Sequence, residues 1–212
     1  MNQQSPRRRL SAQGRRTVIE TAAADVFAER GFRGASIDEI ARRSGVSPPV
    51  IYDHFESKAN LFHLLVERHF AELRAIWFRH AGMGTSIGEW LPAAIEEWFG
   101  YVESHPFAGR MLFRNVTGDS DLEPVVQQIR EDSRDELLPI VEYVLADAGA
   151  EVADALDVEL LWETLRAVLQ GLALWWQDHP DVPRERIVAA AINSIWIGFD
   201  RFLHGDRWQP QR

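Results

Sequence analysis

Two helix-start signals stand close together near the N-terminus, with a glycine between them. Ser36-Ile37-Asp38-Glu39 has the S-x-x-E form of a capping box, in which the serine hydroxyl accepts a hydrogen bond from a backbone N–H of the first turn. Ser47 is a second favourable N-cap, and Pro48 suits a first helical position because the N–H it lacks would have no partner there. Gly45 can end the first helix in a left-handed conformation. The pattern predicts two helices joined by a tight turn.

A further helix precedes this pair and begins near Gly14. Its apolar positions recur at the spacing of one helix face, namely Ile19, Ala22, Ala23, Val26 and Phe27. Gly31 can end it. Two helices joined by a tight glycine turn and supported by a third form a helix-turn-helix unit, here over residues 36–55, whose protruding helix fits the major groove of DNA. Compact three-helix units without a DNA partner also occur.

The rest of the chain has helical periodicity as well, without the alternation of a strand. Glycines and prolines separate the expected helices, which are Lys58 to about Arg79, 89–104, 107–113, 124–148, 157–177 and 184–204. We therefore predict an all-α protein. Its expected parts are a flexible basic arm at 1–13, a three-helix helix-turn-helix domain at 14–62, a larger helical effector-binding and dimerisation domain at 63–204, and a tail at 205–212.

Charge is divided unevenly along the chain. The net charge is −9, yet residues 1–60 hold 10 basic against 7 acidic side chains, whereas the remainder holds 13 against 25. A basic module attached to an acidic one favours a nucleic-acid partner for the first. The chain has no cysteine, which excludes disulfides and thiolate chemistry. Its uncharged stretches are shorter than the roughly 18 apolar residues of a membrane span, and no secretory signal is present, so we expect a cytoplasmic protein without a membrane partner.

The run from Gly31 to Ser47, followed by Ile51 to Leu61, resembles the TetR family of transcriptional regulators. The resemblance implies that the third helix reads double-stranded operator DNA. It also implies the roles of particular residues: Tyr52, His54 and Lys58 match positions that contact phosphates, Ser36 and Ser47 match capping positions whose hydroxyls can meet phosphate, and Pro48, Pro49 and Val50 match the segment pressed against base edges.

The segment expected to contact base edges lacks the polar side chains that sequence-specific hydrogen bonding requires. Pro48-Pro49-Val50 carries no side-chain donor or acceptor, so it can touch thymine methyl groups but cannot make the paired hydrogen bonds that identify guanine or adenine. We therefore expect directed hydrogen bonds from Arg33, Arg43, His54 or the N-terminal arm.

The acidic remainder is rich in aromatic residues, and plain core packing explains any single one of them best. Together they suggest a pocket for a small apolar or aromatic effector, with Trp98, Phe107, Met111 and Trp162 among its walls. The last two helices, 157–177 and 184–204, are apolar on two sides. A helix must bury both such sides, so we expect a homodimer formed through these helices.

The expected function is that of a sequence-specific DNA-binding transcriptional regulator, a repressor released from its operator by a small ligand. One alternative is a DNA-binding recruitment or architectural protein that binds no ligand. Another is an enzyme that carries a helix-turn-helix-like unit, which the lack of a convergent catalytic set disfavours. His63 and Glu67 have metal-ligand spacing but no evident third ligand, so we expect no metal and no cofactor.

Overall fold

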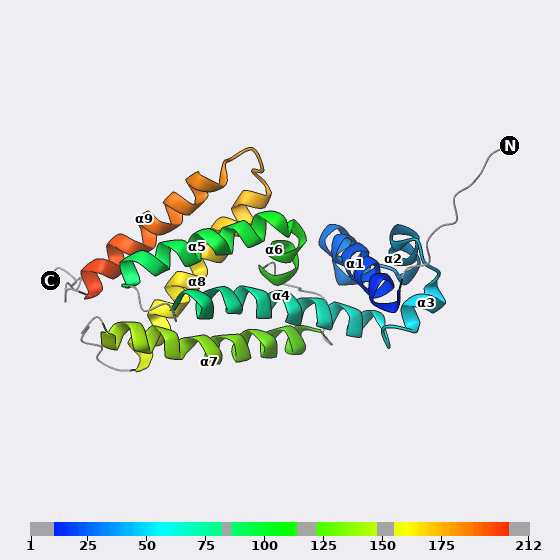
Figure 1. Ribbon diagram of the computed structural model, residues 1–212, viewed down its shortest axis with the longest axis horizontal. Helices are drawn as coiled ribbons and strands as arrows, with labels where there is room; N and C mark the ends of the chain where they lie inside the picture. Colours follow the sequence, from blue (N-terminus) through cyan, green and yellow to red (C-terminus); the bar gives the residue numbers. More distant parts are fainter. Residues whose placement is uncertain (1–10, 82–85, 114–121, 148–154, 204–212) are drawn as a thin grey trace.

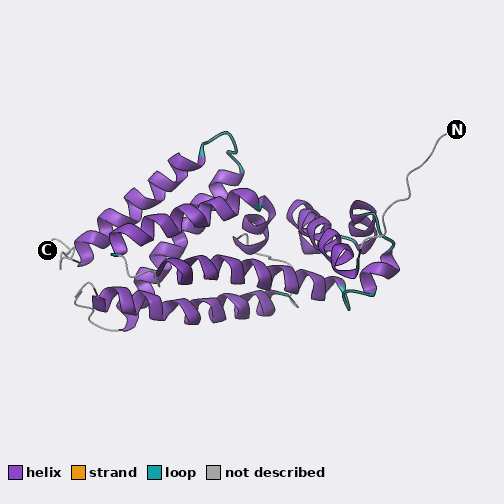
Figure 2. Ribbon diagram, in the orientation of Figure 1, coloured by secondary structure: helices purple, strands orange, loops and turns teal. Residues whose placement is uncertain are grey.

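The computed structural model describes residues 11–81, 86–113, 122–147 and 155–203. Over these ranges every regular element is an α-helix (Figure 2). The helices are α1 Ala12–Gly34, α2 Ile37–Ser44, α3 Pro48–Tyr52, α4 Lys58–Ala81, α5 Ile87–Ser104, α6 Pro106–Phe113, α7 Glu123–Asp147, α8 Ala155–Gln177 and α9 Arg184–Leu203. The all-α prediction is confirmed. The arm and the tail lie almost wholly outside the described residues.

The ends of α1 differ from the prediction. The helix begins before Gly14 because Ser11 acts as its N-cap, its hydroxyl accepting a hydrogen bond from the N–H of Gly14 at 3.1 Å. Gly31 has the expected positive φ of 68°, but the helix kinks there and makes one further turn. The N–H of Ala35 then closes that turn on the carbonyl of Gly31 at 3.2 Å.

Helix α2 has the predicted limits, and α3 begins at the predicted residue but ends earlier than expected, at Tyr52. The Ser36 hydroxyl accepts from the N–H of Glu39 at 3.2 Å, and Gly45 ends α2 in the left-handed conformation, with φ 70° and ψ 23°. Helix α3 spans only five residues. Ile51 and Phe55 are buried, as expected for the inward face, and they fix α3 against the small core of this domain.

Helix α4 connects the two halves of the molecule (Figure 1). Its first turns pack on α1, and its remaining length lies between α5 and α7 in the larger bundle. The boundary expected at residues 62 and 63 therefore falls within one continuous helix. Helix α6 makes a second connection, since it packs on α1 on one side and on α8 on the other. The two halves are thus linked at two places.

The last two helices bury only part of their apolar surface. In α8, Leu169, Ala173 and Trp176 are buried, whereas Leu160 is 56% and Trp175 46% exposed. In α9, the buried side chains are Ile187, Val188, Ala191 and Ile195, and those of Phe199, Phe202 and Leu203 lie outside the described residues. No described helix is both long and apolar enough to cross a membrane.

Candidate DNA interface and ligand cavity

The outer face of α3 carries the side chains expected to meet DNA. Tyr52 is 56% exposed, so core packing does not explain it. His54 is half-buried beside the ring of Phe55, with 6.3 Å between ring centroids. Pro49 is exposed, while Pro48 and Val50 are half-buried. The hydroxyl of Ser47 is exposed and makes no capping hydrogen bond, unlike that of Ser36.

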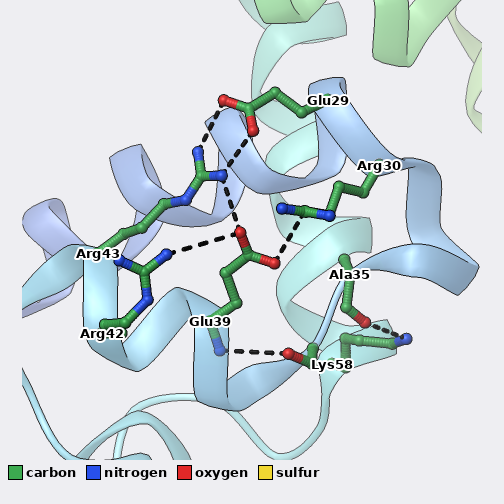
Figure 3. A network of polar contacts seen from close by, with 8 residues as sticks. Glu29, Arg30, Ala35, Glu39, Arg42, Arg43 and Lys58 are labelled. Atoms are coloured by element: carbon green, nitrogen blue, oxygen red, sulfur yellow. Dashed lines mark hydrogen bonds and ion pairs between the residues drawn. The ribbon is translucent and has the colours of Figure 1, made fainter.

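Arg43 lies in a network of ion pairs between α1 and α2 (Figure 3). Its guanidinium donates to both carboxylate oxygens of Glu29, at 2.7 and 2.5 Å, and to Glu39 at 2.8 Å. Arg30 also pairs with Glu39, at 2.9 Å. These hydrogen bonds lower the pKa of Glu29 and of Glu39 and raise that of Arg43. The structure thus gives Arg43 a helix-joining role that the sequence did not indicate, and base contact by Arg43 stays a prediction.

Lys58 is engaged within the protein as well. Its Nζ donates to the backbone carbonyls of Phe32 at 2.8 Å and Ala35 at 2.9 Å, and it lies 4.3 Å from the centroid of the Phe32 ring. The first turn of α4 is thereby fixed to the connection between α1 and α2. Lys58 is the only lysine among the 23 basic residues of the chain. The lysine at this position could have indicated its structural role from the sequence. A compact ammonium with three donors reaches two carbonyls, whereas a planar guanidinium would not match their geometry.

Two arginines of this domain are much more exposed. Arg33 is exposed at the end of α1, and the side chain of Arg42 is 74% exposed with one loose contact to Glu39 at 3.8 Å. Arg42 was not among the expected DNA-contacting residues. Its exposed position in the last turn of α2 makes it a further candidate for phosphate.

The larger domain encloses a cavity of about 450 Å³. Its walls come from α4, α5, α6, α7 and α8. Trp98 lines it and stacks on Phe113 of α6, with 5.5 Å between the ring centroids. Trp162 lines it from α8. The cavity reaches the surface, since the exposed side chains Gln127 and Glu163 also line it. We call this space the polar chamber.

Four arginines line the polar chamber, namely Arg74, Arg130, Arg134 and Arg166. Arg74 pairs with Glu136 at 2.9 Å and Arg166 with Glu163. Arg130 donates to the backbone carbonyl of Leu112 at 2.7 Å, and no described carboxylate lies within ion-pair distance of it. Burial lowers its pKa. A half-buried guanidinium without a paired carboxylate can bind a ligand anion.

A second cavity, of about 160 Å³, adjoins the first. The two share the walls formed by Trp77, Leu137, Trp162 and Leu165. The second is otherwise lined almost entirely by apolar side chains from α4, α5, α7, α8 and α9, including Ile87, Leu91, Val144, Leu161 and Ile195. We call it the apolar chamber. A ligand spanning both chambers would need a charged or polar end and an apolar end.

Of the four predicted pocket residues, Trp98 and Trp162 line the chambers. The side chains of Phe107 and Met111 lie outside the description. Sequence reasoning missed the arginines of α4, α7 and α8. One signal was present, because Arg130, Ser133 and Arg134 share a face of α7 with the buried Leu137. Among the described residues no group of three His, Asp or Glu side chains could hold a metal, and on α4 His63 is half-buried while Glu67 is exposed.

Residues 19–65 match the sequence profile described as bacterial regulatory proteins, tetR family. The chain is 30% identical to the transcriptional activator FasR of Mycolicibacterium smegmatis, over 90% of this chain and 85% of that protein. It is 26% identical to the transcriptional repressor BepR of Brucella suis, over 95% and 91% of the two chains. The fold matches the regulator FadR of Bacillus subtilis, solved in complex with stearoyl-CoA, with a TM-score of 0.71, 18% identity, and coverage of 91% and 100%.

The helix-turn-helix geometry, the exposed face of α3 and these likenesses agree with one another. The profile covers the helix-turn-helix, and the similarity to FasR extends through the larger domain. The chain belongs to the TetR family and is a DNA-binding transcriptional regulator.

Proposed function

We propose that this regulator is a repressor that leaves its operator when a fatty-acyl ligand occupies the two chambers. The observation that carries the proposal is that an arginine-lined chamber adjoins an apolar one and that four residues line both of them. An anionic acyl compound has the matching two ends. The stearoyl-CoA bound to the structurally similar FadR supports this ligand class. This amphipathic ligand class adds a charged end to the small apolar or aromatic effector expected from the aromatic content.

The proposed mechanism uses the two connections between the halves. Trp77 of α4 and Phe113 of α6 line the chambers, and the same two helices pack on α1. A ligand that binds more tightly when α4 and α6 are displaced shifts the protein towards that displaced conformation. The size of the shift equals the difference in ligand affinity between the displaced and the undisplaced conformation. The helix-turn-helix then moves relative to the larger domain. A coupling of about 1.4 kcal/mol weakens operator binding tenfold.

The proposed active form is a homodimer through α8 and α9, with one helix-turn-helix on each half-site. The apolar surface that α8 leaves exposed supports this arrangement. The exposed side chains of Tyr52 and Arg42 meet the duplex, and the acidic larger domain stays away from it.

The test is a footprint or gel shift on the DNA that flanks the gene of this protein. An acyl-CoA series from hexanoyl to stearoyl is titrated, with CoA alone as the control for charge. We expect release of the DNA by acyl-CoA and none by CoA. Acyl-CoA that binds, as measured by tryptophan fluorescence, but leaves the operator affinity unchanged would contradict the repressor mechanism. Absence of any binding would favour the ligand-independent alternative.

A further inference from the structure

One buried indole N–H of the larger domain has no acceptor among the residues that the structure describes. Nε1 of Trp162 is buried, and none of the described residues accepts its hydrogen. Trp176, on the same helix, shows the usual situation, because its Nε1 donates to the carbonyl of Val182 at 2.7 Å. Buried polar groups are nearly always paired, so an exception needs an explanation. The indole N–H can only donate, which restricts the missing partner to an acceptor.

The position of Trp162 indicates where that acceptor lies. The side chain lines both chambers and therefore lies at their junction. On one side are the guanidiniums of Arg130 and Arg166. On the other side the lining hydroxyls are those of Thr164 and Ser194, which donate to the carbonyls of Leu160 at 2.8 Å and Ala190 at 2.7 Å, and neither accepts from Trp162.

The order of groups along the cavity is thus an anion site, the unpaired N–H of Trp162 and then an apolar space. An acyl derivative has the same order, namely a charged head, a carbonyl oxygen and an alkyl chain. We propose that Trp162 Nε1 donates a hydrogen bond to the acyl carbonyl oxygen of the ligand, with the alkyl chain in the apolar chamber and the charged head among the arginines. This assignment rests on the proposed function, because it requires an acyl ligand.

The size of the apolar chamber adds a constraint on the chain. Its volume of about 160 Å³ is close to the roughly 150 Å³ of an engineered apolar cavity that holds benzene. It therefore accommodates about six carbon atoms without repacking. We accordingly choose eight-carbon probes, octanoyl-CoA and S-octyl-CoA, which differ only in the carbonyl oxygen.

The test measures the dissociation constants of both probes for the full-length protein and for Trp162→Phe. We expect the wild type to bind octanoyl-CoA roughly tenfold more tightly than S-octyl-CoA, as expected for one buried hydrogen bond. In Trp162→Phe the two probes should bind within about twofold of each other. Trp176→Phe is the matched control, since that tryptophan is on the same helix, lines neither chamber and already donates to the carbonyl of Val182, and it should keep the tenfold preference.

A second measurement does not depend on any variant being folded. In the wild type labelled with ¹⁵N at tryptophan, the Nε1–H resonance of Trp162 should shift downfield with octanoyl-CoA and shift less with S-octyl-CoA. A wild type that prefers neither probe, or a preference that survives in Trp162→Phe, overturns the assignment while leaving the proposed function intact. Failure of both probes and of longer acyl-CoA to bind the wild type overturns the proposed function itself.

Discussion

Replacing Lys58 with methionine tests how the DNA-binding domain is attached to the rest of the molecule. The change keeps most of the aliphatic stem and removes the ammonium, which donates to two carbonyls at 2.8 and 2.9 Å and lies over the Phe32 ring. Hydrogen bonds from charged groups contribute about 1.5–3 kcal/mol each, and an exposed cation–π contact about 0.5–1 kcal/mol. Because these contacts share one ammonium and are not additive, we expect Lys58→Met to lower the free energy of unfolding by about 3 kcal/mol.

The assay is urea denaturation followed by circular dichroism, together with amide hydrogen exchange in α1 and α2. Exchange is needed because the loss should be concentrated in the small domain. Arg42→Met is the control, since it removes a basic charge from an exposed position of the same domain. It should change the free energy of unfolding by less than about 0.5 kcal/mol. A Lys58→Met protein as stable as this control would refute the reasoning.

The same variant tests whether Lys58 also contacts DNA. Two of its three N–H donors are used within the protein, which leaves one for a phosphate. If it makes that contact, affinity falls about equally for operator and random DNA, and the slope of log K against log salt shrinks by about one. An unchanged slope at a temperature where both proteins are folded would assign Lys58 to structure alone.

Three further predictions concern other parts of the molecule. Val50→Ala should weaken operator binding more than random DNA binding and leave the salt slope unchanged, because a methyl contact with a base carries sequence information; anisotropy titrations at several salt concentrations measure both. Light scattering at micromolar concentration should give twice the 24.2 kDa mass of one chain, and a monomer would contradict the two-half-site mechanism. Burial, with smaller effects of Arg68 and His105, lowers the pKa of His69 to about 4 from 6.5. As the pH drops, the imidazole of His69 is therefore protonated in the unfolded chain before it is protonated in the folded one. The free energy of unfolding should accordingly fall between pH 6.5 and pH 4, and His69→Gln should flatten that part of a plot of unfolding free energy against pH.

The elements of the fold could be predicted because their signals are local. Ser36 and Gly45 set the limits of α2 through hydrogen bonds and a backbone conformation that involve only a few neighbouring residues. The kink at Gly31 was not predictable, because the extra turn that follows depends on packing of Phe32 against Phe27 and Phe62.

The side-chain roles were harder to predict, since they depend on contacts between distant parts of the sequence. Arg43 meets Glu29 from another helix, and Lys58 meets Phe32 across the helix-turn-helix. The aromatic walls of the cavity could be anticipated from composition. Its arginines had only a weak signal, the helix face that Arg130 and Arg134 share with Leu137, and the interior position of Arg130 becomes evident once Leu112 of α6 is placed beside it.

The continuity of α4 has a geometric consequence for operator spacing. Lys58 and Trp77 lie on one unbroken helix, at a separation of about 28 Å along its axis. Rotating such a rod by about 4° about its cavity end carries the other end through about 2 Å, which is the size of ordinary helix displacements. In the proposed homodimer such a rotation in each subunit would move the two ends apart or together, changing the distance between the two α3 helices by about 4 Å, against half-sites about 34 Å apart. A change too small to disturb the packing of either domain is thus large enough to put the two α3 helices out of register with the grooves.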